Sequence, residues 1–192
     1  LGHLLLDQIG HGRLDIATGA DSNTVRLSLG DGTGLFAVAT TVALENGVGA
    51  LVASDPNQDG FEDVIVTLGG NGTRDLAVLL GDGTGALSSP TYFFGGGAGS
   101  TLAIGDMNGD GIDDIVVGIQ DVAVSTNGGA VSVLLGDAAG TFSAPRTAPL
   151  GGGFPPWSLA LGDLNRDGVA DIVLTHEDFA RAPEYGILRG YW

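Results

Sequence analysis

This chain of 192 residues contains no cysteine and no lysine, and its seven basic residues are all arginine. Without cysteine, neither a disulfide nor thiolate catalysis is available. Without lysine, a phosphate-binding P-loop is excluded, because that motif depends on the lysine side chain. The chain also lacks the Gly-x-Ser-x-Gly pattern of a serine nucleophile elbow. These absences argue against cysteine-dependent enzymes, P-loop nucleotide-binding enzymes and hydrolases with a serine nucleophile elbow.

Positive charge is scarce as well, since 23 acidic residues give the chain a net charge of −16. A surface that binds nucleic acid is basic, so we expect no nucleic-acid partner. No apolar run reaches the roughly 18 residues that a membrane helix needs, so we expect no membrane span. The 35 glycines and the 43% of hydrophobic residues are typical of a turn-rich all-β protein with a core.

The most informative feature that is present is an acidic nine-residue pattern that occurs three times. Each copy has oxygen-bearing side chains at positions 1, 3, 5 and 9 and glycine at position 6. This spacing suits a loop around a hard cation, because alternate side chains point inward and glycine permits a sharp turn. Ca²⁺ fits better than Mg²⁺, since it accepts a larger and more flexible shell of oxygens.

We therefore predict about three Ca²⁺ ions per chain, one in each loop. The side chains at positions 1, 3, 5 and 9 and the backbone carbonyl at position 7 are the predicted ligands. These residues are Asp55, Asn57, Asp59, Phe61 and Asp63 in the first loop, Asp106, Asn108, Asp110, Ile112 and Asp114 in the second, and Asp163, Asn165, Asp167, Val169 and Asp171 in the third.

Two features distinguish these loops from EF-hands. Position 12, where an EF-hand has a bidentate glutamate, holds valine or leucine, and the residues that follow each loop are β-branched runs typical of strands. A fourth, degenerate copy spans residues 7–15. It has Ile9 and His11 in place of oxygen ligands and Arg13 beside them, so we expect it to bind no metal.

The acidic loops recur at intervals of 48, 51 and 57 residues, which indicates a repeat architecture. The first three units also contain a Leu-Gly-Asp turn, and a unit has about four short apolar segments. Four-stranded units of this length predict the blades of a β-propeller in one domain, residues 1–192. The approximate repeats are 1–48, 49–99, 100–156 and 157–192.

The pattern Gly-Asp-x-Asn-x-Asp-Gly-x-x-Asp-Ile-Val-Val, followed by Val-Ser-Val-Leu-Leu-Gly-Asp, resembles the FG-GAP or VCBS repeat. That repeat forms the propeller blades of integrin α-subunit heads and of many secreted bacterial proteins and lectins. The resemblance covers nearly the whole chain. It implies that the calcium loops are structural and lie on the blades, away from any catalytic centre.

The last repeat is shorter than the others, because Gly186–Gly190 aligns with the third strand of the preceding unit. Four units that lack one strand make an arc with exposed β edges. Three arrangements would resolve this: a longer parent chain, closure with a second copy, or closure of the chain on itself as a four-bladed ring. We expect them in that order of preference.

Other candidate sites favour structural interpretations. The glycine-rich run from Gly95 to Ser100 lacks a following helix, so we interpret it as a flexible connection between blades. The histidines are too scattered for a zinc site, and we interpret the segment His176 to Asp178 as a solvated acidic connection. Core or inter-blade packing is the expected role of the aromatic residues, which include Tyr92, Phe93, Phe94, Phe154, Trp157, Tyr185, Tyr191 and Trp192.

These observations predict a calcium-binding β-propeller module without catalytic activity that acts in extracellular interaction or adhesion. Weak calcium sites of this type fill at the millimolar calcium found outside cells, so we expect a secreted or cell-surface protein. The expected partner is a protein or a glycan. The alternatives are a lectin with sugar sites between blades, a structural subunit or scaffold domain, and a polysaccharide-degrading enzyme.

Overall fold

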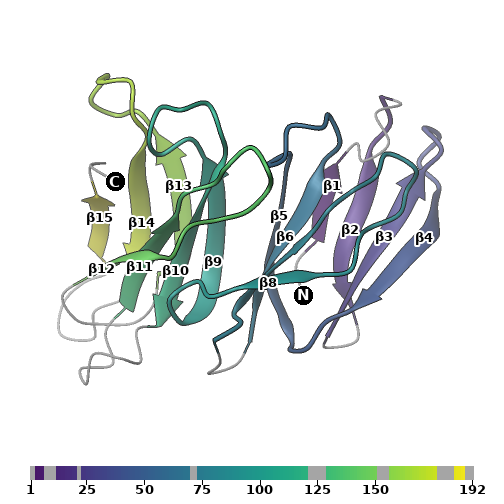
Figure 1. The fold of residues 1–192 in the computed structure, drawn as a ribbon, viewed down its shortest axis with the longest axis horizontal. Helices are drawn as coiled ribbons and strands as arrows, with labels where there is room; N and C mark the ends of the chain where they lie inside the picture. Colours follow the sequence, from purple (N-terminus) through teal and green to yellow (C-terminus); the bar gives the residue numbers. More distant parts are fainter. Residues whose placement is uncertain are drawn as a thin grey trace.

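The computed structural model describes residues 3–6, 12–20, 23–69, 73–120, 129–150, 156–176 and 184–188. The described residues form fifteen β-strands and contain no helix (Figure 1). Accordingly, no helix in these ranges could cross a membrane. The prediction of an all-β protein is confirmed.

Consecutive strands form four antiparallel sheets, each a simple meander, which we call blades 1 to 4. Blade 1 contains β1 (His3–Leu6), β2 (Asp15–Ala20), β3 (Thr24–Gly30) and β4 (Phe36–Ala43). Blade 2 contains β5 (Val48–Ser54), β6 (Asp63–Leu68), β7 (Leu76–Leu79) and β8 (Thr91–Phe93). Blade 3 contains β9 (Ala98–Gly105), β10 (Asp114–Gln120), β11 (Gly129–Leu134) and β12 (Arg146–Pro149). Blade 4 contains β13 (Ser158–Gly162), β14 (Asp171–His176) and β15 (Glu184–Leu188).

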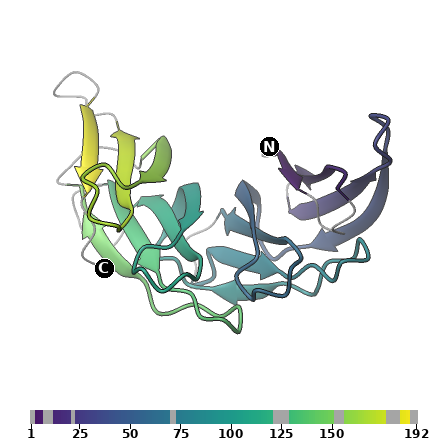
Figure 2. The same cartoon turned by 90° about the horizontal axis from the view of Figure 1, so that it is seen from above.

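The blades follow one another along an open arc (Figure 2). The first strands of neighbouring blades contact one another, β1 with β5, β5 with β9 and β9 with β13. Blade 4 has three strands among the described residues, as the alignment of its last segment predicts. Because blades 1 and 4 lie at opposite ends of the arc, the structure does not show the four-bladed ring.

Three apolar clusters lie between the blades and hold the arc together. Val25 and Leu27 of blade 1 pack against a face of blade 2 that includes Val64. The second cluster lies between the opposite face of blade 2 and blade 3, and the third lies between blades 3 and 4. Because apolar side chains on both faces of the inner blades are removed from water, their β-branched sequences are stable as strands.

Burial along the strands shows which faces are covered. Every residue of β6, β7 and β11 is buried, since blades 2 and 3 have a neighbour on each side. In β3, Val25 and Leu27 are fully buried, whereas Arg26 and Ser28 are only partly buried. Blade 1 therefore packs against blade 2 through one face and presents a less buried face at the end of the arc.

Several residues singled out in the sequence lie outside the described ranges. The degenerate loop is described only from Gly12 onward, and the strands that contain His3, His176 and Tyr185 are described without their side chains. The other residues concerned are His11, Phe154, Glu177, Asp178, Tyr191 and Trp192.

Candidate metal centre

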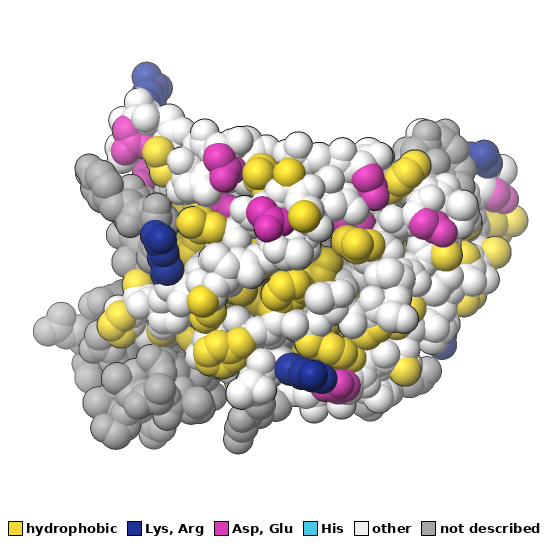
Figure 3. Space-filling model, in the orientation of Figure 1, with side chains coloured by type: hydrophobic (Ala, Val, Ile, Leu, Met, Phe, Trp, Pro, Cys, Tyr) yellow, Lys and Arg dark blue, Asp and Glu magenta, His cyan; other side chains and the backbone are white. Residues whose placement is uncertain are grey.

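Each predicted cation loop joins the first strand of a blade to the second. The loops lie between β5 and β6, between β9 and β10, and between β13 and β14. The aspartate at position 9 is the first residue of the second strand and is buried in all three, as Asp63, Asp114 and Asp171. Acidic side chains form a row across one face of the molecule (Figure 3).

The loop backbone turns at the glycine of position 6, as predicted. Gly60, Gly111 and Gly168 have φ angles of 90°, 82° and 89°, a region that strongly favours glycine. Position 4 has the same left-handed conformation, which the motif did not reveal. It is occupied by Gln58 (φ 56°) in the first loop and by Arg166 (φ 64°) in the third.

The side chains at positions 1, 3 and 5 are drawn together by hydrogen bonds inside each loop. In the first loop, the N–H groups of Asp59 and Gly60 donate to the two carboxylate oxygens of Asp55, at 3.0 and 2.8 Å. Asn57 Nδ2 donates to Oδ2 of Asp59 at 2.9 Å. The other two loops repeat this arrangement, so the three predicted ligand side chains are adjacent in every loop.

The aspartate at position 9 has a second role that sequence reasoning missed. The backbone N–H of Gly81 donates to Oδ1 of Asp63 at 2.7 Å, and that of Gly136 donates to Oδ1 of Asp114 at 2.8 Å. Gly30 makes the equivalent bond to Asp15 at 2.9 Å. The position-9 carboxylate therefore ties the cation loop to the Leu-Gly-Asp turn at the end of the third strand.

The glycine of that turn is required by close approach to the loop. A Cβ atom on Gly136 would lie 2.3 Å from the carbonyl oxygen of Asp113, and one on Gly30 would lie 2.2 Å from that of Leu14. The repeated Leu-Gly-Asp signal could have indicated this packing. The following glycines, such as Gly32 and Gly83, have the positive φ angles predicted for the turn.

The second oxygen of the position-9 aspartate differs between loops. Met107 N–H donates to Oδ2 of Asp114 at 2.8 Å, and Leu164 N–H donates to Oδ2 of Asp171 at 3.1 Å. In the first loop this position is Pro56, which has no N–H. Oδ2 of Asp63 is accordingly buried without a hydrogen-bond partner among the residues that the structure describes.

The surroundings of Asp63 oppose its negative charge. Burial raises the pKa of this carboxyl to about 7, and the charges of Asp59 and Asp55 add to the increase. The pKa of Asp114 is raised in the same way, by burial and then by the charges of Asp110 and Asp106. Positions 1, 5 and 9 are thus close enough to repel one another electrostatically.

These observations allow a test of whether a cation fits. Among the described residues, no three His, Cys, Asp or Glu side chains form a preformed metal cluster. The carboxylate at position 1 instead accepts hydrogen bonds from backbone amides of its own loop. All the predicted ligand atoms are nevertheless oxygens, and the carboxylates among them repel one another. They include Oδ2 of Asp63, which is buried and has no partner among the described residues. A hard cation such as Ca²⁺ fits this chemistry.

The glycine-rich connection between β8 and β9 is anchored by a buried carboxylate. Asp75 accepts hydrogen bonds from the N–H groups of Gly95 and Gly97, the latter at 2.7 Å. The interpretation as an inter-blade connection is confirmed for Gly95, Gly96 and Gly97, whereas Ala98, Gly99 and Ser100 already belong to β9. The connection was expected to be flexible, and in the structure one buried side chain holds two of its backbone amides.

The aromatic residues divide into packed and exposed groups. The rings of Phe93 and Phe142 meet edge to face at a centroid distance of 5.4 Å between blades 2 and 3, which confirms inter-blade packing for Phe93. Tyr92 packs against the cluster between blades 1 and 2. The expectation of packing was wrong for Trp157 and Phe94, which are 67% and 46% exposed.

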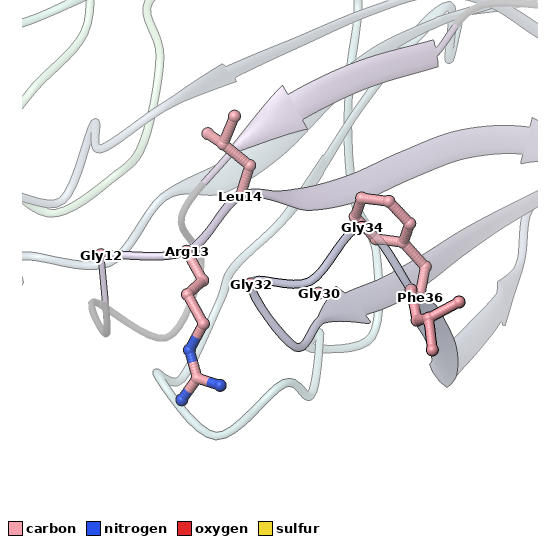
Figure 4. A pocket seen from close by; sticks show the side chains of 8 residues that line it. Gly12, Arg13, Leu14, Gly30, Gly32, Gly34 and Phe36 are labelled. Atoms are coloured by element: carbon pink, nitrogen blue, oxygen red, sulfur yellow. The ribbon is translucent and has the colours of Figure 1, made fainter.

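A shallow hollow of about 370 Å³ lies on blade 1 (Figure 4). Arg13, Leu14, Leu35 and Phe36 line it together with four glycines. The residue equivalent to Phe36 in blade 3, Phe142, packs onto blade 2. The hollow therefore marks the end of the arc where the inter-blade packing pattern stops, and it brings together no set of catalytic groups.

Comparison with known proteins agrees with this geometry. The model of the FG-GAP-like repeat family matches residues 55–117 and 118–174, which together make up more than half of the chain. A search of curated proteins found no match. With its blade-like sheets and its repeated acidic loops, the chain belongs to the FG-GAP-like repeat family.

Proposed function

We propose that this protein is a calcium-binding β-propeller module without catalytic activity, used for extracellular interaction or adhesion. The observation that supports calcium binding best is Asp63, whose Oδ2 is buried and unpartnered beside the carboxylates of Asp55 and Asp59. A bound cation would satisfy that oxygen and offset the repulsion among the three charges.

In this proposal the ligands are the side chains at positions 1, 3, 5 and 9 of each loop, with the backbone carbonyl at position 7. The cation supplies positive charge to a loop that otherwise concentrates carboxylates. The residues of the chain hold the loop in place, because the position-9 aspartate also binds the turn glycine of the third strand. Calcium binding would therefore stabilise the blade itself.

The structural roles of the carboxylates favour a module without catalytic activity. Asp75 holds a connection, and the exposed Asp31, Asp82 and Asp137 accept hydrogen bonds from the backbone of their own turns. The hydrogen bond from the Thr84 hydroxyl, and then the one from the Thr84 N–H, lower the pKa of Asp82. A glycosidase needs one carboxyl kept protonated near a second carboxylate, both within reach of the sugar. Asp63 has a pKa raised to about 7 beside Asp59 and Asp55, but it is fully buried and so does not face a substrate.

Calcium titration calorimetry on chelator-stripped protein tests the proposal. We expect about three ions per chain, together with a higher unfolding temperature in calcium. The matched control is the triple variant Asp59→Asn, Asp110→Asn and Asp167→Asn, which keeps the size of each side chain and removes one charge per loop. Binding of no calcium by folded wild-type protein would contradict the proposal.

A glycan is a second candidate partner, favoured by the exposure of Trp157 and Phe94. Exposed aromatic rings provide flat apolar surfaces that pack against the faces of sugars. The test is retention on a glycan array, with Trp157→Ala as the variant and the calcium-loop variant as its control. Retention that is unchanged in Trp157→Ala would exclude this tryptophan as the platform.

A further inference from the structure

The three cation loops share one hydrogen-bonding scheme except at position 2. In blades 3 and 4, the N–H of Met107 or Leu164 donates to the position-9 carboxylate. In blade 2, Pro56 cannot donate, and no described residue donates to Oδ2 of Asp63 although Asp63 is fully buried. One substitution in the repeat thus separates the first loop from the other two.

We infer that the loop from Asp55 to Asp63 is the tightest of the three cation sites, and that Pro56 makes it so. This inference rests on the calcium binding proposed above and assigns an order to the sites. The probe is Ca²⁺ itself, an oxygen-seeking divalent cation that suits the ligand set.

The first reason is the state of the position-9 carboxylate before a cation arrives. In blades 3 and 4, Oδ2 already accepts a hydrogen bond, which a cation must displace or share. In blade 2 the cation displaces no hydrogen bond. It also removes the penalty of a buried oxygen that no donor of the described residues reaches. The gain on binding is therefore larger in the first loop.

The second reason is the rigidity of the proline ring. Proline fixes its own φ angle and restricts the residue before it, which here is the predicted ligand Asp55. The buried position of Pro56 holds the ring in place. A loop with fewer conformations before binding loses less conformational entropy when it binds. Both effects act in the same direction.

The magnitude follows from the hydrogen bond at stake. The net free energy of a hydrogen bond to a charged group corresponds to a difference in affinity of about tenfold or more. We expect the first loop to bind Ca²⁺ about tenfold more tightly than the second or the third. A water molecule bound to Asp63 Oδ2 in the free protein would remove this difference, so equal affinities would overturn the inference.

Three single variants assign the affinities to the loops. Asp59→Asn, Asp110→Asn and Asp167→Asn each weaken one loop while keeping an acceptor for the N–H at position 7. In calorimetric titrations, only Asp59→Asn should abolish the tightest class of site. If Asp110→Asn or Asp167→Asn abolishes that class, the inference is wrong while calcium binding stands. If wild-type protein binds no calcium, the proposed function fails.

A proline transplant tests the mechanism with a readout that needs no calcium. Leu164 is 56% exposed, so its side chain contributes little packing, and its place in the repeat matches that of Pro56. Leu164→Pro removes the N–H that donates to Asp171, whereas the control Leu164→Ala keeps it. In chelator, Leu164→Pro should unfold at a lower temperature than Leu164→Ala. In calcium it should bind about tenfold more tightly at the third loop.

The reverse change keeps the inference testable if the transplant fails to fold. Pro56→Met places at this position the residue that blade 3 has there, and Met107 is likewise buried. It restores an N–H for Asp63, so the first loop should lose about tenfold in calcium affinity. An unchanged affinity in Pro56→Met, or equal affinities in Leu164→Pro and Leu164→Ala, would show that position 2 does not set the order.

Discussion

The hydroxyl of Ser54 lies 2.5 Å from Oδ2 of Asp113, so the end of β5 in blade 2 is bonded to the cation loop of blade 3. Gln58 Nε2 reaches the carbonyl oxygen of Gly111 at 3.2 Å and makes a second link between the same two loops. The first and second cation loops are therefore in direct contact across the interface between blades 2 and 3.

Ser54→Ala should lower the free energy of unfolding by about 1 kcal/mol, because it removes a hydrogen bond to a charged acceptor that is partly exposed to water. Chemical denaturation measures the change, and Ser89→Ala, at an exposed serine, is the control. A double-mutant cycle with Asp113→Ala isolates the pair. A coupling energy near zero would show that this bond contributes nothing to stability.

The stability of the calcium-free protein should fall as the pH rises from about 4 to about 8. Asp63 has a folded-state pKa raised to about 7, above its ordinary value of 3.8. A group of this kind contributes stability that is complete below the unfolded-state pKa and is lost as the pH rises through the folded-state pKa. Thermal unfolding in chelator across this range measures the effect.

Asp63→Asn is the matched variant for the pH experiment, because the amide keeps an acceptor for Gly81 N–H and carries no charge. In chelator, the variant should be the more stable protein at pH 8 and similar to wild type at pH 4. In calcium at pH 8 the order should reverse, since the variant loses a charged ligand. A difference between the two proteins that does not change with pH would contradict the assigned pKa.

The sequence predicted the parts of the structure that repeat. The period, the β-branched runs and the glycine of position 6 are local signals, and the strands, blades and φ angles agree with them. The second role of the position-9 aspartate was missed, since its bond to Gly81 joins residues 18 apart that become neighbours only in the folded sheet. The exposure of Trp157 was missed for the same reason, because it depends on which blade faces are covered.

Pro56 shows what one substitution within a repeat can do. The acidic pattern is the same in all three loops, and ligand spacing alone treats them as equivalent. The difference is a missing backbone donor, which matters only because Asp63 is buried at the far end of the loop. Its effect depends on three-dimensional proximity, so it could not be derived from the spacing of the ligands.

Gly136→Ala should destabilise the protein by about 2 kcal/mol, because the new Cβ would lie 2.3 Å from the backbone oxygen of Asp113 and the loop would have to move. Gly162→Ala is the control, since a Cβ there would have no atom within 4 Å outside its chain neighbours. The control should keep or slightly raise stability. Equal losses in the two variants would indicate that the close approach at Gly136 is not what requires glycine.

Arg166→Gly should be more stable than Arg166→Ala by about 1 kcal/mol. Arg166 occupies the left-handed region with a φ of 64°, which disfavours any residue with a Cβ, and the second loop has Gly109 at this position with a φ of 82°. The entropy that glycine adds to the unfolded chain offsets part of the gain. Both variants remove the same positive charge from an acidic loop, so their difference in free energy of unfolding reports the backbone conformation alone. Gln58→Gly should likewise be more stable than Gln58→Ala, because Gln58 also has a positive φ angle. Both variants lose the hydrogen bond to Gly111, so that loss cancels in the comparison. If alanine proves as stable as glycine at both positions, then position 4 carries no strain in the folded loop.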